Sequence, residues 1–525
     1  MGRRDVGAGR HGPDLPPRAV HAGVRGYRQQ RRHDRQGAVL RGYVPPIHQG
    51  QHRERLGGLR CRAPGRGCRA ARHLPGLLRG LRLPHQPGAG GDWAGGDGVR
   101  VGIIGGGLAG LTVAWLLDRS VGGTIERVTL FEQDRRLGGK VESVPLDDNG
   151  ARAADLGAQH VAPAIFPTHA RLLRRFGLAT ELIDCPLSVT VSGSGGAVVV
   201  TPHPGLRPQP AGPAGDDNLR YLAGFLDRAC GVEDDQRAWS IPLERVVESV
   251  SLPGWFRREA LYPLLASFVG CPVAQAPELS CRAAAAWLVR NASSSGDQPP
   301  AWYNLRGGLA RLVDSLASDL NRVRVETASP VIRVVPGVRD YEIHACGGVV
   351  DSVDQLVLAA APPDLLPVLD GWPDPVLPRL LRRFEFVRSL VGVHRDPVYM
   401  PGGRDTWSTT NVALTGEPGG PQWAEQSTWY GPITGADVFK SWLTNRDREP
   451  SELLAVRVYD HPVPTVEHVA ARLALGELQG GAGVHFAGSW TTDIDSQESA
   501  VRSALATARR ILPAAHRVAE LDGAV

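Results

Sequence analysis

The chain has 525 residues, 42% of them hydrophobic, with a formal net charge of +5 and a pI near 8.9. This length is enough for two or three domains with a large core. The sequence contains no run of about 18 apolar residues, so no membrane-spanning helix is predicted. The seven cysteines form no Cys-x-x-Cys pair and leave an odd count, so neither a disulfide framework nor a metal site is predicted and a reducing, cytoplasmic location is the simplest expectation.

The first 98 residues are rich in Arg, Gly, Pro and His and contain no Lys, whereas the rest of the chain has more acidic than basic residues. The positive net charge therefore belongs to this segment. Its composition buries too little apolar surface to offset chain entropy, so residues 1–98 are expected to be disordered. Two interpretations stay open, a basic arm for nucleic acid or an anionic membrane, and an extension that is not native to the protein. We favour the second, so no nucleic-acid partner is expected.

The stretch from Val99 to Glu132 contains a short apolar run, a Gly-x-Gly-x-x-Gly turn, a helical pattern and a second apolar run that ends in an acid. This order is typical of a βαβ unit that binds a dinucleotide. The first glycine allows a tight turn, the second lets the backbone approach a pyrophosphate, and the third lets the helix pack closely on the sheet. The phosphates are expected at the helix N-terminus, and the acid is placed to bind a ribose hydroxyl. The predicted contacts are Gly105, Gly107, Leu108, Ala109, Gly110 and Glu132.

Residues 132–140 read Glu-Gln-Asp-Arg-Arg-Leu-Gly-Gly-Lys, and residues 155–160 read Asp-Leu-Gly-Ala-Gln-His. The first segment resembles the acid, basic residue and double glycine that follow the second strand in flavoproteins of the amine oxidase and phytoene desaturase superfamily. The second is similar to the Asp-x-Gly segment that comes next in those proteins. The resemblance implies FAD as the cofactor, with further contacts at Gln133, Arg136, Gly138, Gly139 and Lys140.

From 163 to 300 the pattern changes to helices separated by loops, one of them the Pro/Gly-rich segment 202–217. The sequence predicts a mostly helical first part of a substrate or cap domain, with helices over 168–176, 219–229, 255–268 and 282–290.

Residues 301–366 resemble the part of this superfamily in which the chain returns to the FAD domain. A Gly307-Gly308-Leu309 segment opens a helix, and strands are expected over 323–326, 330–334 and 355–362. The resemblance implies that the backbone of Val331 contacts the adenine side of FAD. The nucleotide-binding domain is therefore expected to be discontinuous.

Residues 367–470 are expected to form the second part of the cap. The segment from Phe386 to Pro397 is similar to a strand and turn found in predicted bacterial NAD/FAD-binding oxidoreductases of the superfamily. His394 and His461 are candidate acid/base groups, because histidine titrates near neutral pH. A lone histidine is more often structural, and changes at either one are expected to be tolerated.

The chain from 471 to 525 resembles the C-terminal flavin motif of the superfamily, in which a strand leads to Ala-Gly and a helix opens at Glu-Gly-Ala. The resemblance implies that Gly488 lies near the FAD phosphates or ribityl chain and that Glu498 is the motif acid. It also implies that backbone amides around Ala500 and Val501 face the N1/O2 edge of the flavin, where a helix N-terminus stabilises negative charge.

These features predict an α/β protein. Its discontinuous, Rossmann-like FAD-binding domain is expected to comprise 99–162, 301–366 and 471–525, and its α+β substrate or cap domain 163–300 and 367–470. The motifs are specific for fold and cofactor, and much less so for substrate.

Two departures argue against a typical monoamine or polyamine oxidase. Those enzymes carry a Lys at flavin N5 on the strand that here includes residues 388–390, where no Lys occurs, and Ser496 occupies the position of an aromatic cage residue. Tyr459 or Trp490 could supply an aromatic wall instead.

We therefore expect an FAD-dependent oxidoreductase that removes hydride from a C–N or C–C bond of an apolar organic small molecule. The electron acceptor, oxygen or a quinone, and the oligomeric state stay open. One alternative is an isoprenoid or lipid desaturase or isomerase that contacts a membrane peripherally, and another is a non-catalytic, flavin-binding accessory protein.

Overall fold

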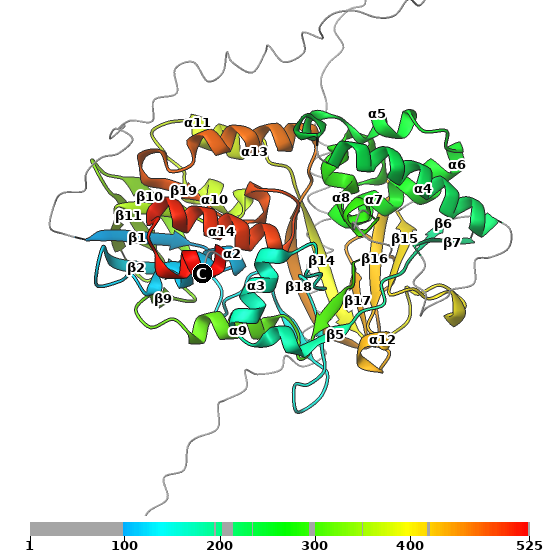
Figure 1. Ribbon diagram of the computed structural model, residues 1–525, viewed down its shortest axis with the longest axis horizontal. Helices are drawn as coiled ribbons and strands as arrows, with labels where there is room; N and C mark the ends of the chain where they lie inside the picture. The colour runs from blue at the N-terminus through cyan, green and yellow to red at the C-terminus, as the bar shows by residue number, and fades with distance from the viewer. Residues whose placement is uncertain are drawn as a thin grey trace, which may run out of the picture.

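The computed structural model describes residues 98–193, 196–201, 214–233, 235–292, 300–348, 350–416 and 420–522. Two large sheets organise these residues, one parallel with five strands and one mixed with seven (Figure 1). The predictions for residues 1–97, and for most of the loop at 202–217, lie outside the described residues.

The five-stranded sheet brings together segments from the beginning, middle and end of the chain, with every neighbouring pair parallel. Its order is β19 (Val484–Phe486), β13 (Gln355–Leu358), β1 (Val99–Ile104), β2 (Ile125–Phe131) and β9 (Arg324–Glu326). Within β1, Val101 and Ile103 belong to the core on one face. Gly102 faces the opposite side, where a Cβ atom would lie 2.4 Å from Ile343. Alternate residues of β1 therefore pack against the layers on the two faces of the sheet.

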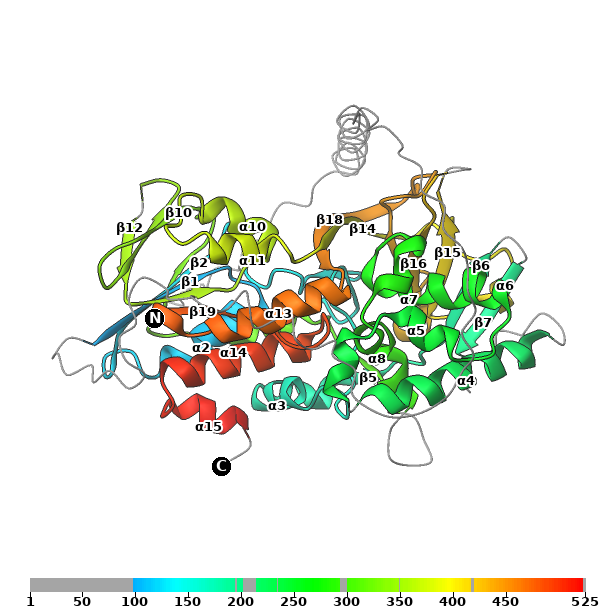
Figure 2. The ribbon, with the colours of Figure 1, turned by 90° about the horizontal axis from the view of Figure 1, so that it is seen from above.

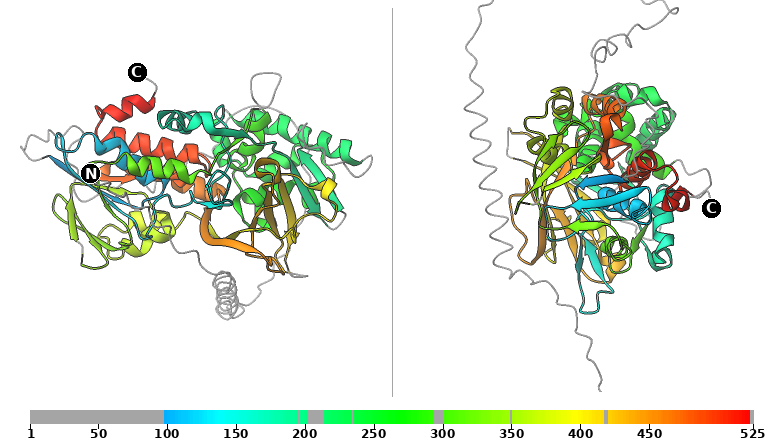
Figure 3. Two further views of the ribbon diagram at one scale, coloured as in Figure 1. Left: turned by 90° about the horizontal axis from the view of Figure 1, so that it is seen from below. Right: turned by 90° about the vertical axis from the view of Figure 1, so that its left-hand side faces the viewer.

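Helices cover one face of this sheet, and a small antiparallel sheet with further helices covers the other (Figures 2 and 3). The first layer contains α2 (Leu108–Asp118), α3 (Pro167–Arg175), α9 (Ala310–Ser318), α14 (Gln497–Ile511) and α15 (His516–Asp522). The second contains β10 (Val331–Pro336), β11 (Tyr341–Ala345), β12 (Val350–Val353), α10 (Pro362–Val368), α11 (Val376–Leu381) and α13 (Val466–Leu478). The strands predicted over 323–326, 330–334 and 355–362 are thus confirmed as β9, β10 and β13, although β13 ends at Leu358 and α10 begins at Pro362.

The seven-stranded sheet has helices packed on one face (Figure 2). Its order is β18 (Leu453–Pro462), β14 (Phe386–His394), β17 (Phe439–Trp442), β16 (Trp423–Trp429), β15 (Thr410–Thr415), β6 (Val189–Gly193) and β7 (Gly196–Thr201). The helices are α4 (Ala214–Glu233), α5 (Leu243–Glu248), α6 (Gly254–Phe256), α7 (Tyr262–Val269) and α8 (Cys281–Ala292), and α12 (Gly431–Thr434) lies between β16 and β17.

Two short strand pairs, β3 (Ser143–Pro145) with β4 (Ala153–Asp155) and β5 (Leu182–Asp184) with β8 (Tyr303–Leu305), complete the described strands. The prediction that 163–300 is mostly helical holds for α3, α4, α7 and α8 but misses the hairpin of β6 and β7. The Val and Thr residues of the hairpin favour strands locally, but the place of β6 in the sheet depends on parallel pairing with the distant β15.

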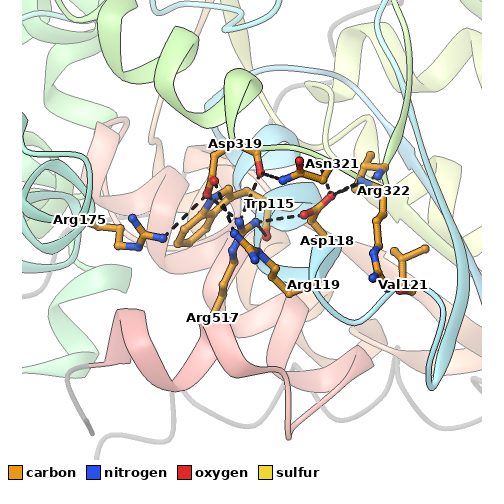
Figure 4. A network of polar contacts seen from close by, with 10 residues as sticks. Trp115, Asp118, Arg119, Val121, Arg175, Asp319, Asn321, Arg322 and Arg517 are labelled. Atoms are coloured by element: carbon orange, nitrogen blue, oxygen red, sulfur yellow. Dashed lines mark hydrogen bonds and ion pairs between the residues drawn. The ribbon is translucent and has the colours of Figure 1, made fainter.

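A buried ionic network fixes the C-terminal helix α15 to α2 (Figure 4). The guanidinium of Arg517, only 1% exposed, donates to the carbonyl of Trp115 (2.7 Å) and to Asp319 (2.6 Å), and it stacks on the Trp115 ring. One oxygen of Asp118 lies 3.5 Å from Arg517, and the other accepts the backbone N–H groups of residues 321–323. A single buried cation therefore links α2, α15 and the loop before β9.

Replacing Arg517 with Leu should destabilise the protein strongly, because the buried carboxylate of Asp118 would lose its cationic partner, while Asp319 would keep its hydrogen bond from Trp115. Breaking a buried ion pair from one side typically costs about 3 to 5 kcal/mol. Denaturant unfolding, followed by limited proteolysis of α15, measures the effect. Arg509→Leu removes an exposed ion pair to Asp522 near the same end of the chain and is the matched control, for which a change below about 1 kcal/mol is expected. Equal stability of the two variants would contradict this account.

Candidate functional site

A cavity of about 1210 Å3 extends from the carboxyl ends of the parallel strands to the seven-stranded sheet. Ile104 at the end of β1, Glu132 after β2, Ala359 after β13 and Gly488 after β19 all line it. Ligands of open α/β sheets bind at this edge. The arrangement therefore gathers the sequence motifs of three distant segments around one space.

The glycine turn forms one wall of the cavity. Gly105 has a φ of +107°, which favours glycine, and a Cβ atom on Gly110 would lie 2.0 Å from the carbonyl oxygen of Gly105. Gly110 therefore serves the packing of α2 and does not line the cavity. A Cβ atom on Gly107, by contrast, would meet only the Cα of Gly139 at 3.9 Å. Gly107 keeps the entrance to the first turn of α2 open.

The carboxylate of Glu132 is buried beside this turn. It accepts the N–H of Gly106 (2.7 Å) with one oxygen and the N–H of Asp134 (2.8 Å) with the other. Burial raises the pKa of Glu132, and the two backbone hydrogen bonds oppose that shift. Each oxygen keeps a further acceptor position, so the group can bind hydroxyl donors from the cavity.

The segment after β2 places two cations on the cavity wall. Arg136 donates to the carbonyl of Gly139 (2.6 Å) and pairs with Glu142, and Lys140 pairs with Asp495 (2.9 Å). Burial alone would raise the pKa of Asp495, but Lys140, His461 and Ser489 hold it below its usual value. Asp495 therefore stays ionised and ties the segment after β2 to the loop before α14.

Helix α14 begins at the cavity with Ser496 as its N-cap, whose side chain accepts the N–H of Ser499 (3.1 Å). The amide of Ala500 is already bonded to the carbonyl of Ser496 (3.1 Å). By helix geometry the groups left free for a ligand are the amides of Gln497 and Glu498, one turn before the predicted ones. Ala500 still lines the cavity, whereas Val501 does not.

The predicted cofactor-binding residues divide into two groups. The carboxylate of Glu498 turns away from the cavity and accepts the N–H groups of Thr168 (3.2 Å) and His169 (2.8 Å), which cap α3. Glu498 joins Gly110 and Val501 outside the lining. The cavity is lined by Gly105, Gly107, Leu108, Ala109, Glu132, Gln133, Arg136, Gly138, Gly139, Lys140, Val331, Gly488 and Ala500.

Strand register separates the two candidate histidines. His461 pairs with Val387, Trp442 with Val391 and Lys440 with Val393, so these side chains share the face of the sheet that lines the cavity. His394 is the next residue of β14 and lies on the opposite face, where it bonds Ser441 (2.8 Å). Burial lowers the pKa of His394 to about 4. This geometry supports the structural interpretation of His394.

His461, Tyr459 and Trp490 lie at the cavity. The His461 ring stacks on Trp442 with centroids 4.7 Å apart, and its Nδ1 is 3.8 Å from Asp495. Burial lowers the pKa of His461 and raises that of Tyr459, whose hydroxyl donates to Glu142 (3.2 Å). Of the four acid/base and aromatic candidates, three therefore line the cavity.

Sequence reasoning missed Lys440, which projects from β17 into the cavity. No Lys occurs at 388–390 on β14, as noted above, but the neighbouring strand supplies one in register with Val393. Its ammonium is buried and donates to the carbonyl of Gly157 (2.5 Å). Burial lowers its pKa to about 8, and Asp155 opposes that shift. Only the pairing of β14 with β17 could have revealed this position.

In the described part of the chain, no helix has the length and apolar character needed to cross a membrane. Nor do three or more His, Cys, Asp or Glu side chains there come together in a way that could hold a metal ion.

The family of flavin-containing amine oxidoreductases matches residues 108–393, more than half of the chain. The chain belongs to this family. It is therefore an FAD-dependent oxidoreductase, and FAD is its cofactor. No curated protein matches the chain in sequence.

Solved structures of low sequence identity share the fold. Cyclohexylamine oxidase from Brevibacterium oxydans is 16% identical with a TM-score of 0.54 and covers 79% of this chain and 100% of its own. A fatty acid isomerase from P. acnes that produces CLA is 13% identical with a TM-score of 0.57, and a putrescine oxidase is 15% identical with a TM-score of 0.54. Both cover 79% of this chain and 99% of their own. At these identities the likeness shows the fold alone.

The burial of His394 predicts a specific pH dependence of stability. Between its ordinary pKa of 6.5 and about 4, the unfolded chain binds a proton at this residue that the folded protein does not bind. His394 therefore lowers the free energy of unfolding by about 1.4 kcal/mol for each unit of acidification in that window. His394→Asn should make the slope of unfolding free energy against pH shallower by that amount, as measured by denaturant unfolding from pH 7 to 4.5. An unchanged slope would show that His394 is already protonated in the folded protein.

Proposed function

We propose that the chain binds FAD across the glycine turn and oxidises an apolar organic substrate in the part of the cavity beneath the seven-stranded sheet. The observation that carries this proposal is the continuity of one cavity from Gly107 to the side chains of Trp287, Trp302 and Trp442. The five-stranded sheet with its glycine turn would then be a Rossmann-like, discontinuous FAD-binding domain, and the seven-stranded sheet with its helices the cap.

The lining residues fit FAD in chemistry as well as in space. Gly107 leaves a path that a larger side chain would fill, and the first turn of α2 offers free N–H groups that favour a pyrophosphate. Arg136 and Lys140 line the same wall, where Glu142 and Asp495 balance their charges. Glu132 is placed to accept a ribose hydroxyl, and the first amides of α14 would face the flavin ring edge. We infer that these residues hold the cofactor.

FAD, when bound, would accept a hydride from a C–H bond of the carbon whose C–N or C–C bond is oxidised. The residues of the chain would exclude water and orient the substrate. Phe268, Val269 and Leu288 form apolar wall beside the three tryptophans, and dry surroundings strengthen the electrostatic effect of the α14 N-terminus. For oxidation at a C–N bond a dedicated acid or base is not required, because the nitrogen lone pair stabilises the cation that hydride loss leaves.

The isomerase or desaturase alternative uses the same cofactor and the same apolar wall. It is favoured by the likeness to the fatty acid isomerase, and it predicts a substrate with a long hydrocarbon chain. The accessory-protein alternative is disfavoured by membership of an oxidoreductase family. The acceptor of the electrons and peripheral contact with a membrane stay open expectations.

Gly107→Val should abolish FAD binding without unfolding the protein. The backbone of Gly107, with φ −65° and ψ 178°, suits any residue, and the new side chain has room to project into the cavity. Flavin absorbance of the purified full chain measures occupancy, and circular dichroism measures folding. Gly402→Val, where an added Cβ meets nothing within 4 Å, is the control and should retain flavin. Full flavin content in the Gly107 variant would exclude this path for the cofactor.

Anaerobic mixing of the FAD-loaded protein with apolar amines, acids and polyenes tests the reaction itself. A productive substrate should bleach the flavin absorbance at a rate close to that of its turnover. Re-oxidation of the reduced flavin by oxygen or a quinone would then identify the electron acceptor. Product formation without net bleaching would favour the isomerase alternative. A folded protein that binds no flavin would refute the proposed function.

A further inference from the structure

The ammonium of Lys440 has more hydrogen-bond donors than the surrounding protein has acceptors. It carries three N–H groups, and in the part of the chain that the structure describes its polar partner is the carbonyl of Gly157. The nearest carboxylate in its surroundings is Asp155, which lies beyond ion-pair distance and accepts the hydroxyl of Ser143 and the N–H of Leu309. Two donors of a buried cation are therefore left for a ligand.

The cavity wall around Lys440 provides no negative charge. The wall formed by β6, β15, β16, β17, α7 and α8 consists of apolar, aromatic and uncharged polar side chains in addition to Lys440. The other ionisable groups that act on Lys440 are Asp155 behind the wall and the buried His160 and His461. Burial lowers the pKa of each histidine, so neither adds a charge at neutral pH.

Three carboxylates that line the cavity have cationic partners, whereas the others, Glu132, Asp134 and Asp364, lie beyond the carboxyl ends of β2 and β13, toward the glycine turn. Asp495 pairs with Lys140 (2.9 Å), Asp493 with Arg290 (2.7 Å) and Asp460 with Arg388 (3.0 Å). None of the three paired carboxylates is available to compensate a cationic substrate. An alkylammonium group would have to leave water and approach Lys440, which is unfavourable in a desolvated site.

We propose that the substrate is an apolar organic acid, whose carboxylate accepts hydrogen bonds from Lys440 while its hydrocarbon part contacts the tryptophan-lined wall. This inference rests on the proposed function, because it assigns the substrate class of the same cavity. A carboxylate would fill the two vacant donor positions and neutralise the buried cation. It applies equally to oxidation and to isomerisation of the acid.

Binding of matched eight-carbon ligands to the FAD-loaded full chain tests the inference without requiring turnover. Octanoate, octanol and octylamine differ only in the head group, and each is titrated at pH 7 while the flavin difference spectrum is recorded. Octanoate should bind at least about tenfold more tightly than either of the others, as expected for a charge-assisted hydrogen bond. Equal affinities, or tighter binding of octylamine, would overturn the inference.

Two variants test whether the preference for octanoate depends on Lys440. Lys440→Met keeps a side chain of similar length without the charge and should lose the tenfold preference for octanoate over octanol, whereas Lys440→Arg should keep most of it. A Met variant that retains the full preference would also overturn the inference. If that variant loses FAD, the wild-type comparison still decides the matter. Failure of the proposed function would instead be seen as absent flavin or absent reduction, whichever head group binds better.

Discussion

The hydrogen bond from Gly106 to Glu132 fixes the turn between β1 and α2 against the end of β2, and the position of the cavity depends on it. The adjoining Gly105 has a φ of +107°, and Gly110 lies against its carbonyl oxygen, so the turn has little freedom to move. Because the strands are parallel, their carboxyl ends meet at one edge. The remaining motifs reach the cavity because their strands join this edge.

Buried and partly buried ion pairs hold the segments together at both edges of the parallel sheet. Arg517 ties the last helix to α2, and Lys140 with Asp495 ties the segment after β2 to the loop before α14. Glu498 adds a third link by capping α3 from inside α14. A buried charge without its partner is costly. These links therefore hold the N-terminal and C-terminal segments around the parallel sheet in fixed positions relative to each other.

The sequence predicts features that depend on neighbouring residues better than features that depend on distant pairing. The glycine turn and Glu132 follow from local spacing, and the structure places them at the cavity as expected, although their contacts with FAD stay predictions. His394 and His461 look alike in the sequence, because only the register of β14 with β18 decides which of them faces the cavity. The hairpin of β6 and β7 was not predicted, and its place in the sheet likewise depends on distant pairing, since β6 pairs with the remote β15.

Lys440 shows how a local motif can mislead about a site that is built from several strands. Strand β14 has no lysine at 388–390, but it pairs with β17, which carries Lys440. The register of this pair brings the Lys440 ammonium to the cavity wall. The two ends of the cavity consequently differ in electrostatics. Near the glycine turn, helix N-termini suit a cofactor phosphate, while Lys140 is paired with Asp495 and Glu132 accepts a hydrogen bond from the turn. In the wall formed by β6, β15, β16 and β17, Lys440 stands among apolar and uncharged polar side chains, so under the proposed function the head group of the substrate, more than its hydrocarbon part, would determine which molecules this site selects.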